Sequence, residues 1–82
     1  MVIKIPFRGN RASVLRKIQE EALKQGIFFK GTTASGNFEG QGIVGRYWFS
    51  QPQELTIVID EKPMLITENK IKEEIQRYLE VF

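Results

Sequence analysis

The chain of 82 residues suffices for one small domain, and we expect residues 1–82 to fold as a single unit. Its composition is that of a folded protein, and its formal net charge of +2 is too small to argue for nucleic acid by itself. The sequence contains no cysteine and no histidine. Their absence excludes disulfides, thiolate metal sites and the side chain that most often acts as a general base.

The hydropathy pattern gives no sign of a membrane span or a leader. No stretch approaches the roughly 20 apolar residues that a membrane-spanning helix requires. The first residues, Met1–Ile5, also lack the layout of a signal peptide. We therefore expect a cytoplasmic protein.

The N-terminal third predicts a strand followed by an amphipathic helix. Ile3, Ile5 and Phe7 alternate with other residues, as on a strand with one apolar face. A helix is predicted from Arg11 to Gln25, with Asn10 as its N-cap and Gly26 as its stop. The apolar stripe of this helix has helical spacing and consists of Val14, Leu15, Ile18 and Ala22.

Four strands are predicted next, at residues 27–32, 37–39, 43–50 and 54–60. Turns at residues 34–36, 40–42 and 51–53 connect them. Consecutive strands joined by such short turns pair antiparallel. The position of the first strand stays open, because it could pair at either edge of this sheet.

The segment Gly40–Gly45 spells G-x-G-x-x-G, the fingerprint of a dinucleotide-binding loop. In such a loop the glycines open a helix whose N-terminus receives the pyrophosphate. Here the aromatic run Arg46–Ser50 follows, which favours a strand. The glycines are therefore predicted to be hairpin and bulge positions of an antiparallel sheet.

A final helix is predicted from its N-cap Thr67 through Leu79. Its apolar stripe consists of Ile71, Ile75, Tyr78, Leu79 and Phe82. The whole pattern predicts an α+β fold of order β-α-β-β-β-β-α, an antiparallel sheet with two helices packed on one face.

Strand alternation predicts which residues face the helices. One face carries Ile43, Gly45, Tyr47 and Phe49, together with Leu55, Ile57 and Ile59. The opposite face then carries Val44, Arg46, Trp48 and Val58, which we predict to form a partner-binding patch because an exposed Trp among valines favours contact with another surface. The alternative is a register shifted by one residue, which would bury Trp48 in the core.

A second set of residues suggests a different partner. Arg8 and Arg11 bracket the start of the first helix, where backbone N–H groups favour anions. Lys4 and Lys30 could extend this site, and nearby aromatic residues would stack on bases. This set predicts, as the alternative, a domain that binds single-stranded nucleic acid.

Catalysis is not expected. No histidine is present to activate the serines and threonines, and the acidic residues fall in turns or on exposed helix faces. We therefore predict that the protein is not an enzyme, with no catalytic residue, no metal site and no cofactor.

Part of the chain resembles a known family. The relevant residues are the step Gly42–Tyr47, the strand Leu55–Ile59, the pair Leu65 and Ile66, and the regularly spaced Ile71, Ile75 and Leu79. Their order is similar to that of the polyhydroxyalkanoic acid system proteins, small bacterial proteins linked to storage-polyester granules. The segment Pro6–Asn10 lacks the histidine typical of that family, so no functional residue is transferred.

These observations together predict a small non-catalytic binding or interaction domain. A groove beneath Ile71, Ile75 and Tyr78 would take an apolar ligand, a peptide or a polymer surface. The exposed patch would serve a homodimer or another partner.

Overall fold

A computed structural model describes residues 2–50 and 53–80, with side chains described up to residue 77. The elements in chain order are β1 (Val2–Pro6), α1 (Arg11–Lys24), β2 (Phe28–Gly31), β3 (Ser35–Gly40), β4 (Ile43–Ser50), β5 (Glu54–Glu61) and α2 (Glu68–Glu80). This order is the predicted β-α-β-β-β-β-α, and the α+β class is confirmed. Residues 51 and 52 of the predicted turn 51–53 lie outside the described residues. The last residues of the apolar stripe predicted for the final helix, Tyr78, Leu79 and Phe82, lie outside the described side chains.

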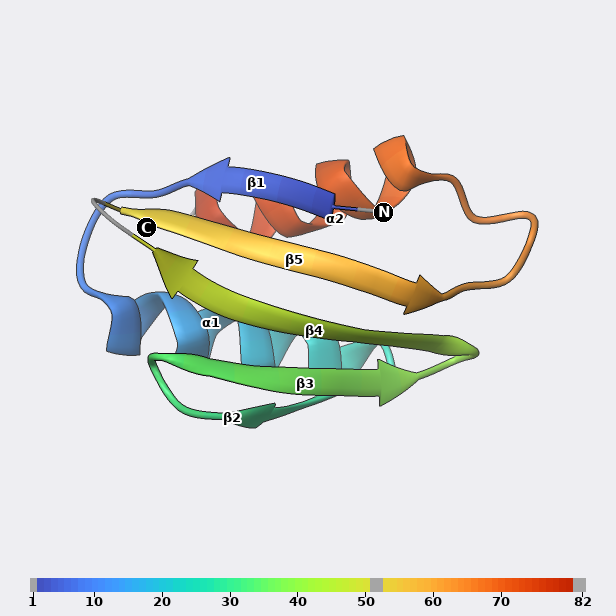
Figure 1. The fold of residues 1–82 in the computed structure, drawn as a ribbon, viewed down its shortest axis with the longest axis horizontal. Helices are drawn as coiled ribbons and strands as arrows, with labels where there is room; N and C mark the ends of the chain where they lie inside the picture. Colours follow the sequence, from blue (N-terminus) through green and yellow to red (C-terminus); the bar gives the residue numbers. More distant parts are fainter. Residues whose placement is uncertain (1, 51–52, 81–82) are drawn as a thin grey trace.

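All five strands form one antiparallel sheet in the order β1-β5-β4-β3-β2 (Figure 1). Strands β2 to β5 follow one another as a meander, as the short turns predict. Strand β1 pairs with β5, with Ile3 opposite Ile57, which settles the position that the sequence left open. β1 and β2 are therefore the two edges of the sheet.

The third strand is longer than predicted. It begins at Ser35, inside the predicted turn, and Ser35 pairs with Trp48 of β4. The turn lies earlier, where the Thr32 hydroxyl accepts hydrogen bonds from the backbone N–H groups of Ala34 and Ser35. Pairing with β2 and β4 on both sides extends a segment whose own composition is only weakly strand-forming.

Local signals in the sequence define α1. The Asn10 side chain accepts a hydrogen bond from the Ser13 N–H at 2.8 Å, which caps the first turn. Gly26 follows the last turn with a φ of 79°, a conformation that glycine adopts without strain. Between them Val14, Leu15 and Ile18 are buried, as the apolar stripe predicts.

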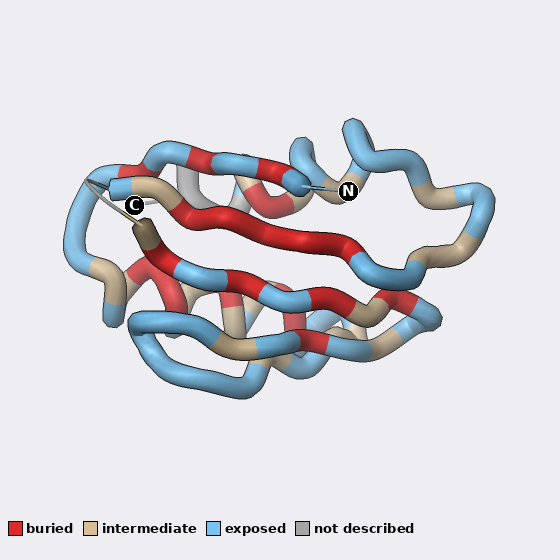
Figure 2. Tube along the Cα trace, in the orientation of Figure 1, coloured by how far each residue is buried: buried red, intermediate tan, exposed pale blue. Residues whose placement is uncertain are grey.

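The hydrophobic core joins the sheet to both helices. Figure 1 shows α1 and α2 behind the sheet, and the core contains Ile18 from α1 and Ile75 from α2. Burial alternates along β4, where Ile43, Gly45, Tyr47 and Phe49 are buried, so the predicted register is confirmed. In the interior strand β5, which lies between β1 and β4, every residue from Leu55 to Ile59 is buried, the continuous red stretch of Figure 2.

The hairpin between β3 and β4 confirms the interpretation of the G-x-G-x-x-G segment. Gln41 and Gly42 have φ angles of 54° and 79°, and two positive values in a two-residue loop are typical of a type I′ hairpin turn. A register irregularity between Val44 and Gly45 marks a β-bulge. No helix follows Gly45, so these glycines do not form a dinucleotide site.

Gly45 matters because an aromatic ring lies directly on it. A Cβ at this position would lie 2.9 Å from Phe38 Cε1, nearer still to Phe38 Cζ, and against the carbonyl oxygen of Val58. Phe38 in turn stacks on Phe29 with ring centroids 4.6 Å apart. Glycine at position 45 therefore leaves room for the Phe38 ring against the backbone of β4, and Phe29 stacks on that ring.

We expect Gly45→Ala to lower the free energy of unfolding by about 3 kcal/mol, because the new methyl group must displace the Phe38 ring or the β5 backbone. Urea denaturation measures this change. Gly9→Ala is the control, since its Cβ would meet nothing within 4 Å and only the φ of 92° opposes it, at a cost of about 1 kcal/mol. An equal loss in both variants would contradict the packing described for Phe38.

Candidate functional site

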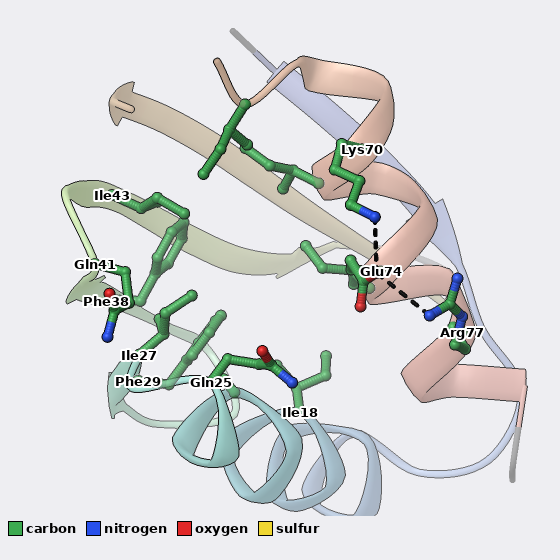
Figure 3. A pocket seen from close by; sticks show the side chains of 14 residues that line it. Ile18, Gln25, Ile27, Phe29, Phe38, Gln41, Ile43, Lys70, Glu74 and Arg77 are labelled. Carbon is green, nitrogen blue, oxygen red and sulfur yellow. Dashed lines mark hydrogen bonds and ion pairs between the residues drawn. The ribbon is translucent and has the colours of Figure 1, made fainter. Parts of the chain in front are cut away.

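A cavity of about 500 Å³ lies between the two helices and the sheet, at the end where β3 turns into β4 (Figure 3). Its wall is mostly apolar, and its lining includes Ile18, Phe29, Phe38, Ile43, Ile71 and Ile75. Sites for small molecules usually have volumes of roughly 300–1,000 Å³ and apolar walls. The cavity thus has the size and the lining of a ligand site.

Two small residues, Ala22 and Gly45, leave space between the helices and the sheet. Ala22 is buried on the face of α1 that lines the cavity, where a longer side chain would extend into it. On the sheet side, the Phe38 ring occupies the space next to Gly45, where a side chain is missing. On α2, Ile75 is buried but Ile71 is only half-buried. The helices therefore cover the sheet here without filling the volume between them.

Polar side chains edge the cavity on two sides. Gln25 and Gln41 come from the end of α1 and the β3–β4 turn, and Lys70, Glu74 and Arg77 come from α2. Figure 3 shows the three charged residues on the opposite side of the space from Phe29 and Phe38. The combination of an apolar wall and a few polar groups favours ligands that are mostly apolar.

The sequence anticipated part of this cavity. The groove was expected beneath Ile71, Ile75 and Tyr78, and both isoleucines line the cavity. The Tyr78 side chain lies outside the described residues. The residues from β2, β3 and α1 were not foreseen, because nothing in the local pattern shows which part of the core is underfilled.

The predicted partner-binding patch lies on the open face of the sheet, away from the helices. Arg46 pairs across the strands with Val58, and Trp48 pairs with Thr56. Trp48 is 39% exposed and Val44 is half-buried, but Val58 is only 9% exposed. Val58 was expected to be exposed, and it is buried because it lies on the interior strand β5, between its cross-strand neighbours Val2 on β1 and Arg46 on β4.

An ion pair crosses this open face. The Arg46 guanidinium donates from Nε and Nη2 to the two carboxylate oxygens of Asp60, at 3.0 and 2.9 Å. This guanidinium holds the pKa of Asp60 below its ordinary value, and the hydrogen bonds to Asp60 raise the pKa of Arg46. Arg46 therefore stays protonated, and Asp60 offsets its charge.

The structure does not gather the cations predicted for nucleic acid. Lys4 lies on β1 and Lys30 on β2, the two edges of the sheet, which are four strand spacings or about 19 Å apart. The Arg11 guanidinium lies 5.9 Å from the ring centroid of Phe49, whose side chain faces the helices. Arg8 is in the exposed loop between β1 and α1. These placements do not favour a continuous strand-binding groove.

The remaining charged side chains in the described part of the chain lie mostly on exposed surfaces. Within residues 2–50 and 53–80, no group of three or more acidic side chains is placed to hold a metal ion. The pKa of Glu21 is lowered by hydrogen bonds from Lys17 and Lys24 on the exposed side of α1. No helix in the described part of the chain is long and apolar enough to cross a membrane.

Comparison with family models, with curated proteins and with solved structures finds no match for this chain. The resemblance to the polyhydroxyalkanoic acid system proteins therefore stays a prediction, and the functional argument depends on the geometry alone.

One buried titratable group gives the fold a pH dependence. The Tyr47 hydroxyl donates a hydrogen bond to the Thr32 carbonyl oxygen at 2.8 Å, and burial raises the pKa of Tyr47 above its ordinary value of about 10. The folded state then holds this proton more tightly than the unfolded state. Its contribution to stability is complete below pH ~10 and is lost as the pH rises through the pKa of the folded protein.

We expect the urea midpoint of the wild type to fall between about pH 10 and pH 11.5 more steeply than that of Tyr47→Phe, which lacks the titrating group. At pH 7 the same substitution should cost about 1 kcal/mol, because it removes the hydrogen bond to Thr32. Urea unfolding curves of the wild type and Tyr47→Phe at pH 7 measure the loss of the hydrogen bond, and curves between about pH 10 and pH 11.5 measure the alkaline decline. Parallel alkaline declines in the two proteins would show that Tyr47 is not the responsible group.

Proposed function

We propose that this protein is a small, non-catalytic binding domain whose cavity between α1, α2 and the sheet takes an apolar small molecule. The observation that carries the proposal is a space of about 500 Å³ walled by isoleucine and phenylalanine inside so small a fold. The space is partly open to solvent, with exposed Lys70 and Arg77 at its edge, so a ligand can reach the apolar wall without the fold opening. Filling the space would also remove further apolar surface of both helices from water.

The wall of the cavity carries few groups that a ligand would leave unpaired. No buried side-chain nitrogen or oxygen in the described residues lacks a hydrogen-bond partner. An apolar ligand therefore needs no specific polar contact deep in the cavity. Each methylene group that moves from water into the cavity should tighten binding by about fourfold.

A series of straight-chain alcohols tests this proposal by calorimetry. Affinity should rise about fourfold per methylene from hexanol to octanol and level off when the chain fills the cavity. The fluorescence of Trp48, which lies on the opposite face of the sheet, should stay unchanged. The absence of saturable binding by any alcohol would contradict the proposal.

Ala22→Leu provides the matching variant. Its longer side chain should occupy part of the cavity, lower alcohol affinity at least tenfold, and change the free energy of unfolding by no more than about 1 kcal/mol. Ala12→Leu, the same change at an exposed position of α1, should leave affinity unaltered. If Ala22→Leu binds like the wild type, the alcohol is bound elsewhere.

A second candidate function concerns the open face of the sheet. Trp48, Val2 and Phe28 lie on β4, β1 and β2 with exposed fractions of 39%, 58% and 53%, and the pairing registers place all three on this one face. Exposed apolar side chains on one face favour contact with a second surface. The partner would be a second copy of the chain. If the chain shares the function of the polyhydroxyalkanoic acid system proteins, the partner would instead be the surface of a storage-polyester granule in the bacterial cytoplasm.

Trp48→Ala should lower the free energy of unfolding by no more than about 1 kcal/mol while weakening self-association or retention on polyester granules. The comparison is Tyr47→Ala, which removes a fully buried ring and should cost about 3–5 kcal/mol. Sedimentation equilibrium and granule co-sedimentation measure the association. A monomeric wild type that also stays off the granules would eliminate this candidate.

A further inference from the structure

The mouth of the cavity is cationic on balance. Five polar residues line the cavity: Gln25, Gln41, Lys70, Glu74 and Arg77. Two of them are cations and one is an acid, so the mouth carries a net charge of +1. The apolar wall and the charged mouth therefore face one another across the same space (Figure 3).

Glu74 lies between the two cations. Its carboxylate lies 3.6 Å from Lys70 Nζ and 3.3 Å from Arg77 Nη1, and its side chain is 28% exposed. The Lys70 and Arg77 side chains are 64% and 67% exposed. An ammonium group has three N–H donors and a guanidinium has five, so one carboxylate leaves donors over for a second anion.

We propose, on the basis of the binding function proposed above, that the ligand is a single-chain amphiphile with one anionic head group. Its chain lies against the apolar wall, including Phe29 and Phe38, and its head accepts hydrogen bonds from Lys70 and Arg77 beside Glu74. The complex then has a neutral mouth. A cationic amphiphile would instead add charge to a site that is already positive.

Decanoate and decanol, used below their aggregation concentrations at pH 7, are the probes, because they share a chain and differ in charge. Calorimetry should give decanoate an affinity about tenfold higher at low salt, which is the scale of two exposed ion pairs. That advantage should shrink as the salt concentration rises from 0.02 to about 0.5 M. Decylammonium should bind more weakly than decanol.

The variants separate the head group from the chain. The double substitution Lys70→Gln with Arg77→Gln should reduce decanoate affinity below that of decanol, because Glu74 then leaves the mouth with a charge of −1, and should leave decanol affinity unchanged. Lys72→Gln is the control for the loss of one positive charge from α2, because Lys72 is exposed and does not line the cavity, and it should leave decanoate affinity nearly unchanged. Glu74→Gln should strengthen decanoate binding, since it removes the competing carboxylate.

Two failures have different meanings. If decanol binds and decanoate binds no better, or if the double variant keeps the preference for decanoate, the anionic head group is wrong while the apolar cavity remains a binding site. If neither compound binds, the proposed function itself is wrong.

Discussion

The missing side chain at Gly45 is the constraint on which the interior depends. It lets the Phe38 ring lie on the backbone of β4, and Phe29 stacks on Phe38 from the neighbouring edge strand. The row of rings continues through Tyr47 and Phe49 to Phe7, with centroid distances of 5.6 to 6.0 Å. At one end of this row, Phe29 and Phe38 line the cavity together with Ile18 and Ala22 of α1. The cavity lies at the end of the row where the short Ala22 side chain is the α1 residue opposite the rings.

The two helices contribute unequally to the core. α1 is capped at both ends and buries four residues, Val14, Leu15, Ile18 and Ala22. Among its described side chains, α2 buries only Ile75, and Ile71 is half-buried. Segments with few buried apolar contacts open locally at lower free energy than the rest of a fold. We therefore expect α2 to be the element that moves when a ligand enters or leaves the cavity.

Sequence patterns predicted most of the architecture because local physics determines it. The alternation of Ile43, Tyr47 and Phe49 predicted which residues of β4 face the core. Asn10 and Gly26 predicted where α1 begins and ends. The edge that β1 joins was not predictable, since it depends on packing between segments far apart in the chain. Val58 was misjudged for a related reason: a strand pattern assigns a face, but burial depends on the strands at either side.

The cavity was harder to foresee than the elements around it. A sequence shows which side chains are apolar, but a cavity is a deficit of volume among residues from five elements. Ala22, Gly45 and the stacked Phe29 and Phe38 produce that deficit together. The stripe of Ile71 and Ile75 indicated one wall, and the charges of Lys70 and Arg77 at the mouth were visible in the sequence only as a solvated helix face.

The most direct test of the account is NMR of isoleucine methyl groups during titration with decanol. Six isoleucines line the cavity, namely Ile18, Ile27, Ile43, Ile66, Ile71 and Ile75. Four others, Ile3, Ile5, Ile57 and Ile59, are buried elsewhere in the core. The account predicts saturable shifts confined to the first set. Shifts that are strongest in the second set, or none at all, would contradict it.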